Sequence, residues 1–265
     1  MTAAPGQGEA GPVRGHGGDG GEAASGFPTR KAVVTGASRG LGSTLAGFLA
    51  GVGYDLVVTA RGRAALEAAA ATLPGEGDVR TLAGDVTDPA HRKALAEAVG
   101  DSLDLLVLNA SALGPSPLPR LAEVDVDALR QVLEVNVVAQ LALTQALLPA
   151  LTRGRGLVVA VTSDAAVGGY PGWGPYGASK AALELLARTF AGEADGVAVA
   201  VVDPGDMRTA MQQRAFPDQD IGDRPAPDVT LPFFAWLLEQ PRAAVDGGRF
   251  LAQADAWTLP AEPAP

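Results

Sequence analysis

The sequence contains no cysteine among its 265 residues and only two histidines, His16 and His91. Without cysteine, disulfides, thiol nucleophiles and thiolate metal sites are excluded. Two histidines exclude a histidine-based zinc site and leave little for a Ser-His-Asp hydrolase, so we predict no metal centre. His91 follows Asp88 and Pro89 in what reads as a first helical turn, and we expect it at the surface.

Long apolar runs and basic clusters are missing as well. No uninterrupted apolar run reaches the ~18 residues of a membrane-spanning helix, and the chain does not begin with a charged stretch followed by an apolar core. The net charge is −10 and there is no basic run, which argues against nucleic acid as a partner. We therefore expect a cytoplasmic protein that binds neither membranes nor nucleic acid.

The composition fits a single globular domain, because 47% of the residues are hydrophobic and 19% are charged. Residues 1–29 are rich in Gly, Ala and Pro and lack periodicity, which predicts a disordered tail. We expect the folded domain to span residues 30–255 and a Pro-rich C-terminal tail to follow at 256–265.

Seven strand-like runs alternate with Ala- and Leu-rich helical stretches. Most of these runs are continuously apolar, which indicates strands that are buried on both faces. Strands alternating with helices predict an α/β fold with one doubly wound parallel sheet, whose ligands bind at the carboxyl ends of the strands. The expected strands are Ala32–Thr35, Asp55–Ala60, Val79–Ala83, Leu103–Leu108, Leu157–Thr162, Val197–Val202 and Arg249–Ala252.

A glycine-rich turn follows the first expected strand. Gly36, Gly40 and Gly42 lie between that strand and an amphipathic helical pattern. Glycines let the backbone approach an anion, and the free N–H groups of a helix start point toward it. The spacing differs from the usual Gly-x-Gly-x-x-Gly fingerprint, so by itself the motif is also compatible with a turn that binds nothing.

Arginines occupy the position where a dinucleotide fold often has an acidic residue. About 20 residues after the glycine turn, a carboxylate usually binds the ribose 2′-hydroxyl. Here the second strand ends in Arg61, with Arg39 inside the glycine turn and Arg63 nearby. Guanidinium groups suit a 2′-phosphate by charge and by geometry, which predicts NADP(H) in preference to NAD(H). The alternative is that these arginines are solvated loop charges.

A serine, a tyrosine and a lysine form the candidate chemical group. Ser163 ends the fifth expected strand, and Tyr176 and Lys180 are four residues apart, on one helix face. A free tyrosine has a pKa of about 10. A nearby lysine ammonium, together with the positive ring of an oxidised nicotinamide, favours the phenolate, so we expect a lowered pKa for Tyr176. Tyr176 would then exchange a proton with a substrate oxygen that Ser163 holds. A surface Tyr/Lys pair is the alternative.

Two further polar residues allow a functional and a structural interpretation. Asp85 ends the third strand and could accept from an adenine amino group; the alternative is a helix N-cap, a role that Thr87 or Asp88 fills better. Asn136 lies on the apolar side of its helix, where an amide needs a partner. It is therefore either a paired core amide or a functional one.

Together these motifs resemble the short-chain dehydrogenase/reductase family from about Arg30 to Ala254. The resemblance implies a Rossmann-type sheet, with Ser163, Tyr176 and Lys180 as catalytic residues and Asn136 supporting a water-linked proton relay. It also implies homodimers or homotetramers and a small-molecule carbonyl or alcohol substrate. The motif residues expected to bind the cofactor are Gly36, Ser38, Arg39, Gly40, Leu41, Gly42, Arg61, Asp85, Val86, Asn109, Ala110, Tyr176, Lys180, Pro204, Gly205 and Thr209.

The sequence departs from the family pattern after the fourth strand, where Ser111 replaces a glycine. The resemblance predicts an NADP(H)-dependent oxidoreductase with Tyr176 as general acid/base and a substrate lid at about 206–227. The alternative is a non-catalytic nucleotide-binding regulatory or scaffold protein. Ser111 is the one feature that favours this alternative, and the intact Ser163, Tyr176 and Lys180 argue against it.

Overall fold

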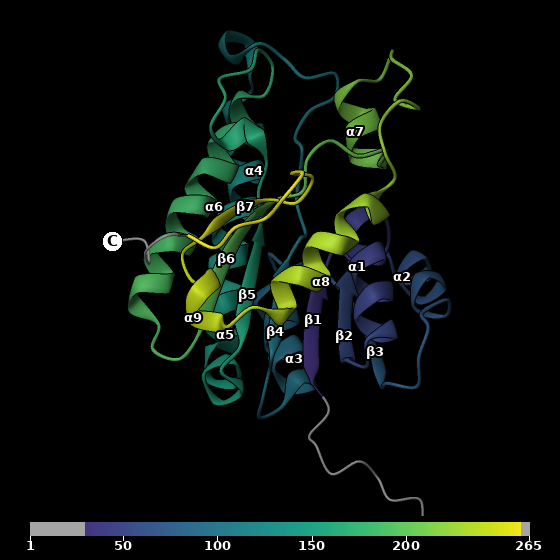
Figure 1. Cartoon of the computed structure of the whole chain (residues 1–265). Coiled ribbons are helices and arrows are strands. Elements are labelled where there is room, and N and C mark those ends of the chain that lie inside the picture. The colour runs from purple at the N-terminus through teal and green to yellow at the C-terminus, as the bar shows by residue number, and fades with distance from the viewer. Residues whose placement is uncertain (1–29, 261–265) are drawn as a thin grey trace, which may run out of the picture.

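The computed structural model describes residues 30–260, so the predicted tail at 1–29 and the last part of the predicted C-terminal tail lie outside the described residues. A parallel sheet of seven strands runs through the domain in the order β3-β2-β1-β4-β5-β6-β7 (Figure 1). This confirms the predicted doubly wound fold. The strands are β1 Lys31–Thr35, β2 Asp55–Ala60, β3 Val79–Ala83, β4 Leu105–Leu108, β5 Leu157–Val161, β6 Ala198–Asp203 and β7 Arg249–Leu251.

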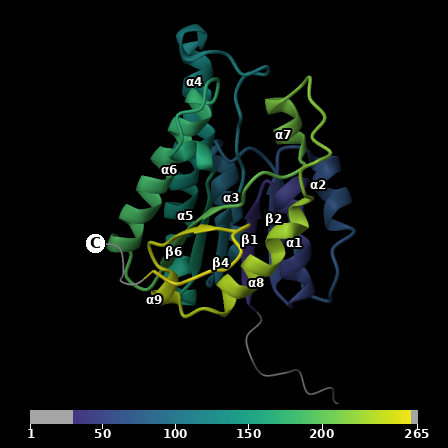
Figure 2. The same ribbon diagram turned by 45° about the horizontal axis from the view of Figure 1, so that its top comes forward.

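Helices cover both faces of the sheet, as the turned view also shows (Figure 2). Helices α1, α2 and α8 pack on one face, and α3, α5 and α6 pack on the other. The helices are α1 Gly40–Gly51, α2 Arg63–Ala70, α3 Pro89–Val99, α4 Val126–Leu133, the π-helical turn η2 Glu134–Val138, α5 Ala139–Gly154, α6 Gly174–Glu193, α7 Ala210–Ala215, α8 Leu231–Glu239 and α9 Arg242–Val245; the 3-10 turns are η1 Leu121–Glu123, η3 Asp164–Ala166 and η4 Pro227–Thr230.

The apolar strands separate two hydrophobic cores. In β1, Val33 packs among α3 and α5 side chains, whereas Val34 packs on the opposite face with Leu45 and Leu49 of α1. Alternate residues of a strand point to opposite faces, so a strand in the middle of such a sheet is apolar along most of its length. The continuous apolar runs of the sequence therefore have a direct structural cause.

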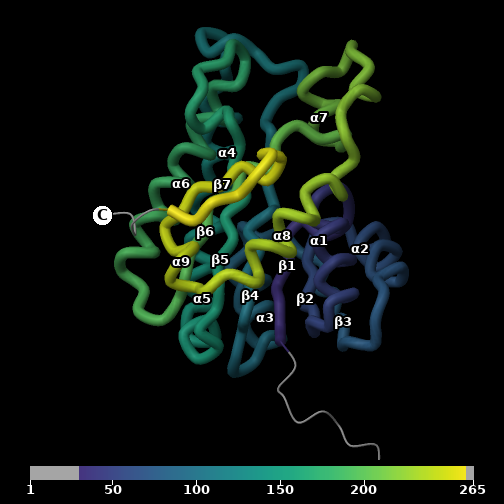
Figure 3. The backbone as a smooth tube through the Cα atoms, in the orientation of Figure 1, coloured from purple at the N-terminus to yellow at the C-terminus, as the bar shows by residue number. Residues whose placement is uncertain are grey.

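The path of the chain reverses between β1 and β4. The chain builds β1, β2 and β3 outward to one edge, returns through α3 to β4, and then builds β5, β6 and β7 toward the other edge (Figure 3). Loops after β1 and β4 therefore diverge at this switch point and leave a crevice at the carboxyl ends of the strands.

His91 is a correction to the sequence-based expectation. The side chain of Asp88 caps α3 by accepting from the Ala90 N–H at 2.9 Å, as anticipated. His91, however, is only 8% exposed, and its Nε2 lies 2.8 Å from the Thr59 hydroxyl of β2. Gly84 makes room for the ring, since a Cβ on Gly84 would lie 2.2 Å from His91 Nδ1. The orientation of α3 on the sheet, which its first turn does not specify, directs this position inward.

One helical segment of the domain is both long and apolar. By length and composition alone, Val126–Gly154, which joins α4, η2 and α5, could cross a membrane. Its residues Leu143, Leu147 and Leu151 are buried against the sheet. The core helix of a globular protein passes the same compositional test, and the packing observed here is of that kind.

Candidate active site

A cavity of about 730 Å³ lies at the carboxyl ends of the strands, a size typical of small-molecule sites. The glycine turn, the ends of β2 to β6, the start of α6 and helix α7 line it. Every predicted site residue contributes to its wall except Gly42 and Asn136, which lie behind it. The structure thus brings residues from the whole length of the domain to one site.

The glycine turn has the geometry of an anion cradle. Gly36 and Gly40 have φ angles of +68° and +56°, which residues with a Cβ rarely adopt. A Cβ on Gly36 would lie 2.8 Å from Asn109 Nδ2, and one on Gly42 would lie 2.4 Å from the Gly36 carbonyl oxygen. Gly42 therefore allows α1 to pack closely against the turn, although it does not line the cavity.

The N-terminus of α1 has free N–H donors that could bind a phosphate. Within the described residues, no side chain caps this helix, and its first turn carries no acidic residue. The first N–H groups of a helix lack intrahelical partners and carry a partial positive charge. These groups face the cavity beside Gly40 and Leu41. The donors and the close backbone approach therefore fit the pyrophosphate of a dinucleotide.

Arg39 and Arg61 line the same end of the cavity, and both are exposed. Neither forms an ion pair with another residue in the described range 30–260. Arg63 does not line the cavity and instead lies 3.4 Å from Glu67 Oε1 on α2. Two of the three predicted arginines are thus placed to meet an anionic ligand, and Arg63 is a solvated helix charge.

Asp85 lies on the cavity wall next to these arginines. Its Oδ1 accepts from the backbone N–H and the hydroxyl of Thr87, both at 2.9 Å. Burial favours a higher pKa for the Asp85 carboxyl, but the two bonds from Thr87 and the charge of Arg61 outweigh it, so the pKa is lowered. Asp85 is therefore an ionised acceptor, and the capping role belongs to Asp88.

Asn109 organises the switch point. Its Nδ2 donates to the Thr35 carbonyl oxygen at 2.8 Å, while its backbone N–H donates to the Thr35 hydroxyl at 2.9 Å. These bonds tie the end of β4 to the end of β1. The Asn109-Ala110 motif thus forms part of the cavity wall next to Gly36.

Lys180 is buried on α6, with an exposed fraction of 2%. Its ammonium donates to the Val161 carbonyl oxygen at 2.8 Å and lies 5.5 Å from the centroid of the Tyr176 ring. Burial lowers the pKa of Lys180 to about 8, and the nearby Glu184 carboxylate opposes this effect. Lys180 is therefore mostly cationic at neutral pH but close to its titration range.

The pKa of Tyr176 is a second correction. The side chain is 8% exposed, and burial raises its pKa; a hydrogen bond with Ser111 works in the opposite direction, and Asp203 and Asp164 raise the pKa further. With the protein side chains alone, the pKa of Tyr176 is raised and not lowered, because burial removes the phenol from water. The neutral phenol is the dominant form, which suits a proton donor.

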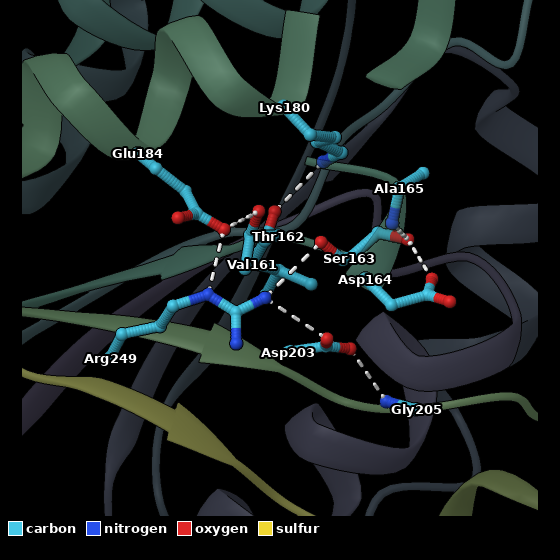
Figure 4. Close-up of polar contacts among 10 residues, drawn as sticks. All are labelled: Val161, Thr162, Ser163, Asp164, Ala165, Lys180, Glu184, Asp203, Gly205 and Arg249. Atoms are coloured by element: carbon cyan, nitrogen blue, oxygen red, sulfur yellow. Dashed lines mark hydrogen bonds and ion pairs between the residues drawn. The ribbon is translucent and has the colours of Figure 1, made fainter. Parts of the chain in front are cut away.

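Ser163 lies at the cavity wall with its hydroxyl engaged by its own neighbours. Its Oγ donates to Asp164 Oδ1 at 2.9 Å and accepts from the Ala165 N–H at 3.2 Å (Figure 4). To donate to a substrate oxygen, this hydroxyl has only to rotate away from Asp164. The acidic neighbour is a feature of the site that the sequence motifs did not single out.

Asn136 is a paired core amide. It is fully buried in the π-helical turn between α4 and α5. Its Nδ2 donates to the Ala112 carbonyl oxygen at 2.8 Å and to the Ser179 hydroxyl at 2.9 Å. Its Oδ1 accepts from the Ala112 N–H at 2.7 Å and from the Ser111 hydroxyl at 3.2 Å. Of the two open interpretations the structure supports the structural one, and a proton relay through Asn136 stays a prediction.

Ser111 lines the cavity and connects two of these groups. Its hydroxyl donates to Asn136 Oδ1 at 3.2 Å. When the same hydroxyl turns to the Tyr176 oxygen instead, it lowers the pKa of the phenol. The residue that departs from the family glycine therefore acts as a polar support of the site.

The outer part of the cavity is apolar and is closed by the segment after β6. Met207, Met211 and Phe216 line it together with Trp173, whose ring centroid lies 6.1 Å from that of Phe216. The Arg214 guanidinium donates to the Gly114 carbonyl oxygen at 3.0 Å. Arg214 therefore connects α7 to the loop that contains Gly114.

The Pro204-Gly205 turn and Thr209 complete the wall opposite the glycine turn. Gly205 has a φ angle of +74°, and its N–H donates to Asp203 Oδ1 at 3.0 Å. The Thr209 hydroxyl caps α7 by accepting from the Gln212 N–H at 3.2 Å. The Thr209 side chain, which is expected to bind the cofactor, thus also serves as a helix cap.

Comparison with known proteins identifies the family. The model of the short chain dehydrogenase family matches residues 30–220. The chain is 38% identical over 194 residues to 1-deoxy-11-beta-hydroxypentalenate dehydrogenase of Streptomyces exfoliatus, covering 70% of each chain. It is 36% identical over 185 residues to an uncharacterized oxidoreductase of Saccharomyces cerevisiae, covering 68% of this chain and 71% of the relative.

Solved structures support the same family assignment. A short chain dehydrogenase from Pseudomonas syringae superimposes with a TM-score of 0.79 at 31% identity, covering 84% of this chain and 94% of the other. One from Escherichia coli CFT073, complexed with NADPH, gives a TM-score of 0.78 at 32% identity, covering 85% and 97%. The chain belongs to the short-chain dehydrogenase/reductase family and is an oxidoreductase of that family.

Proposed function

We propose that the protein is an NADP(H)-dependent oxidoreductase that transfers a hydride between nicotinamide and the carbon of a carbonyl or secondary alcohol, with Tyr176 as general acid/base. The observation that carries the proposal is the placement of Tyr176, Lys180 and Ser163 in one cavity with the anion cradle of α1. This arrangement supports the proposal, because a substrate in the cavity would meet both a proton donor and a bound cofactor.

The protein side chains have separate parts in this reaction. Bound nicotinamide supplies or accepts the hydride. Ser163 rotates from Asp164 to the substrate oxygen and holds it by a hydrogen bond. Tyr176, a neutral phenol in its buried position, donates its proton to that oxygen as negative charge develops there during reduction. The Lys180 ammonium stabilises the phenolate that remains.

Cofactor preference rests on Arg39 and Arg61. Both line the cavity beside the glycine turn, and their charge suits a 2′-phosphate. The E. coli structure complexed with NADPH supports the same choice by similarity. Fluorescence titration with NADPH and NADH tests it: tight NADPH binding with weak NADH binding is expected, and equal affinities would refute the preference.

The substrate is proposed to be a modest hydrophobic ketone or aldehyde. Trp173, Met207, Met211 and Phe216 form the apolar part of the wall. Asp164 and Asp206 also line the cavity, and their negative charges disfavour a substrate carboxylate next to them. A panel of neutral and carboxylate-bearing carbonyl compounds tests this, with turnover expected for neutral compounds.

We also propose that the protein forms a homodimer or homotetramer, as family resemblance suggests. Val138 at the end of η2 and Leu185 on α6 are 51% and 62% exposed, although both are large apolar side chains. Light scattering coupled to size-exclusion chromatography tests the state, and Leu185→Glu is expected to weaken association through this surface.

A further inference from the structure

Arg249, the first residue of β7, joins three parts of the site wall (Figure 4). Its Nε lies 3.1 Å from Glu184 Oε1 of α6. Its Nη2 lies 3.2 Å from Asp203 Oδ2 at the end of β6 and 3.3 Å from the Ser163 carbonyl oxygen. The side chain of Arg249 is 24% exposed. It does not line the cavity, so β7 places a cation behind the residues of the cavity wall.

Glu184 links this cation to Lys180. It lies four residues after Lys180 on α6 and therefore on the same helix face, and its side chain is 4% exposed. Glu184 Oε1 also accepts from the Thr162 hydroxyl at 2.7 Å, while Lys180 donates to the carbonyl oxygen of Val161, the preceding residue. Two successive residues at the end of β5 thus anchor two successive turns of α6.

Asp203 extends the network to the other side of the cavity. Its Oδ2 faces Arg249, and its Oδ1 accepts from the Gly205 N–H at 3.0 Å. The side chain is 5% exposed, and burial raises the pKa of its carboxyl, while the Gly205 bond and the Arg249 charge oppose this. A planar guanidinium is suited to such a bridge, because its fixed fork reaches several oxygens at once.

The charges around the proton-transfer pair come from four elements. Tyr176, Lys180 and Glu184 lie on α6, Asp164 follows β5, Asp203 ends β6 and Arg249 begins β7. Glu184 favours the ammonium form of Lys180. Arg249 neutralises part of this effect, because it pairs with the same carboxylate. Glu184 and Arg249 compensate each other's charge in the protein interior, whereas either charge left there without its partner would lower the stability of the fold.

We propose that Glu184 and Arg249 are positioning residues that act through Lys180. Glu184 holds the α6 face of Lys180 against the end of β5, and Arg249 balances the charge of Glu184 while connecting it to the Ser163 backbone and the Gly205 turn. The inference rests on the proposed function in so far as it assigns Lys180 a part in proton transfer. It adds two residues outside the family motif to the site.

The chain is suited to a direct test, because it contains only three lysines, Lys31, Lys93 and Lys180. NMR of protein labelled with carbon-13 at lysine Cε gives one resonance for each, and the loss of one signal in Lys180→Met assigns Lys180. The midpoint of its titration with pH is then measured in the wild type and in variants. The measurement needs neither cofactor nor substrate, so it separates failure of this inference from failure of the proposed function.

The wild-type midpoint is expected near pH 8. Glu184→Gln removes a negative charge and leaves the Arg249 cation unbalanced, so the midpoint falls by roughly one pH unit. Arg249→Gln leaves Glu184 unopposed, so the midpoint rises. The double variant Glu184→Gln with Arg249→Gln returns toward the wild-type value, which a merely structural role does not predict.

Arg188→Gln is the matched control. Arg188 lies one turn beyond Glu184 on α6 and is exposed. Its replacement by glutamine changes the net charge of the protein by the same amount as Arg249→Gln. It is expected to leave the Lys180 midpoint unchanged. Shifts of the same sign in both single variants, or none in either, would overturn the proposal. If Arg249→Gln does not fold, the proposal is tested by Glu184→Gln and the double variant. Glu184→Gln should lower the Lys180 midpoint, whereas the double variant should not.

Discussion

Replacement of Arg61 by alanine should weaken the binding of NADPH and so reduce the preference for NADPH over NADH. Arg61 lines the cavity, is exposed, and forms no ion pair within residues 30–260, so its guanidinium has no protein partner to lose. A hydrogen bond to a charged group contributes about 1.5–3 kcal/mol. Because Arg61 is solvated, we take the lower half of this range, which corresponds to roughly 10- to 40-fold in Kd for NADPH.

The assay is fluorescence titration with each nucleotide in wild type, Arg61→Ala, Arg39→Ala and Arg63→Ala. NADH has no 2′-phosphate, so its Kd should change less than threefold or so in every variant. Arg63→Ala is the matched control, since Arg63 pairs with Glu67 outside the cavity. Equal weakening of NADPH and NADH by Arg61→Ala would refute the reasoning, because the arginine would then act on a part that the two nucleotides share.

Three other outcomes follow from the polar contacts. Asn136→Ala leaves the Ala112 carbonyl oxygen and backbone N–H without their partner; it should lower the free energy of unfolding by about 2–4 kcal/mol, measured by urea denaturation. Burial lowers the pKa of His91, with Asp88 and Asp85 opposing, so the stability from the neutral ring is present above its unfolded pKa and is lost as pH falls below it. Thermal melting from pH 7.5 to 5 should show this loss, and His91→Gln should reduce the slope. Ser111→Gly removes an interaction that lowers the pKa of Tyr176. In the variant, the rising limb of the pH-rate profile for alcohol oxidation should therefore move to higher pH. The NADPH affinity should stay within about threefold of the wild type.

The sheet could be predicted closely from the sequence because its physical cause is local. Strands that are buried on both faces are apolar along most of their length, so β2, from Asp55 to Ala60, can be recognised from its apolar run Leu56–Val58. The glycine turn could be predicted for a similar reason, since Gly36 and Gly40 are required by backbone angles that few other residues adopt.

The features that were missed depend on contacts between distant segments. His91 is buried because Gly84 and Thr59, which belong to other elements, leave a place for its ring. The Tyr176 pKa is raised chiefly because the phenol is buried, and a spacing of four residues in the sequence does not reveal that burial. Arg249 lies 65 residues beyond Glu184, and only the order of β6 and β7 in the sheet brings them together.

The most direct test of the account compares the wild type with Tyr176→Phe. Each protein is mixed with NADPH and a panel of neutral hydrophobic ketones and aldehydes, and the oxidation of NADPH is monitored as the loss of nicotinamide absorbance. Tyr176→Phe keeps the ring that packs against Trp173 and removes only the hydroxyl that donates the proton. The account predicts turnover in the wild type, a loss of at least about 100-fold in kcat for the variant, and unchanged NADPH affinity. Turnover by the variant at the wild-type rate would contradict the assignment of Tyr176 as the proton donor.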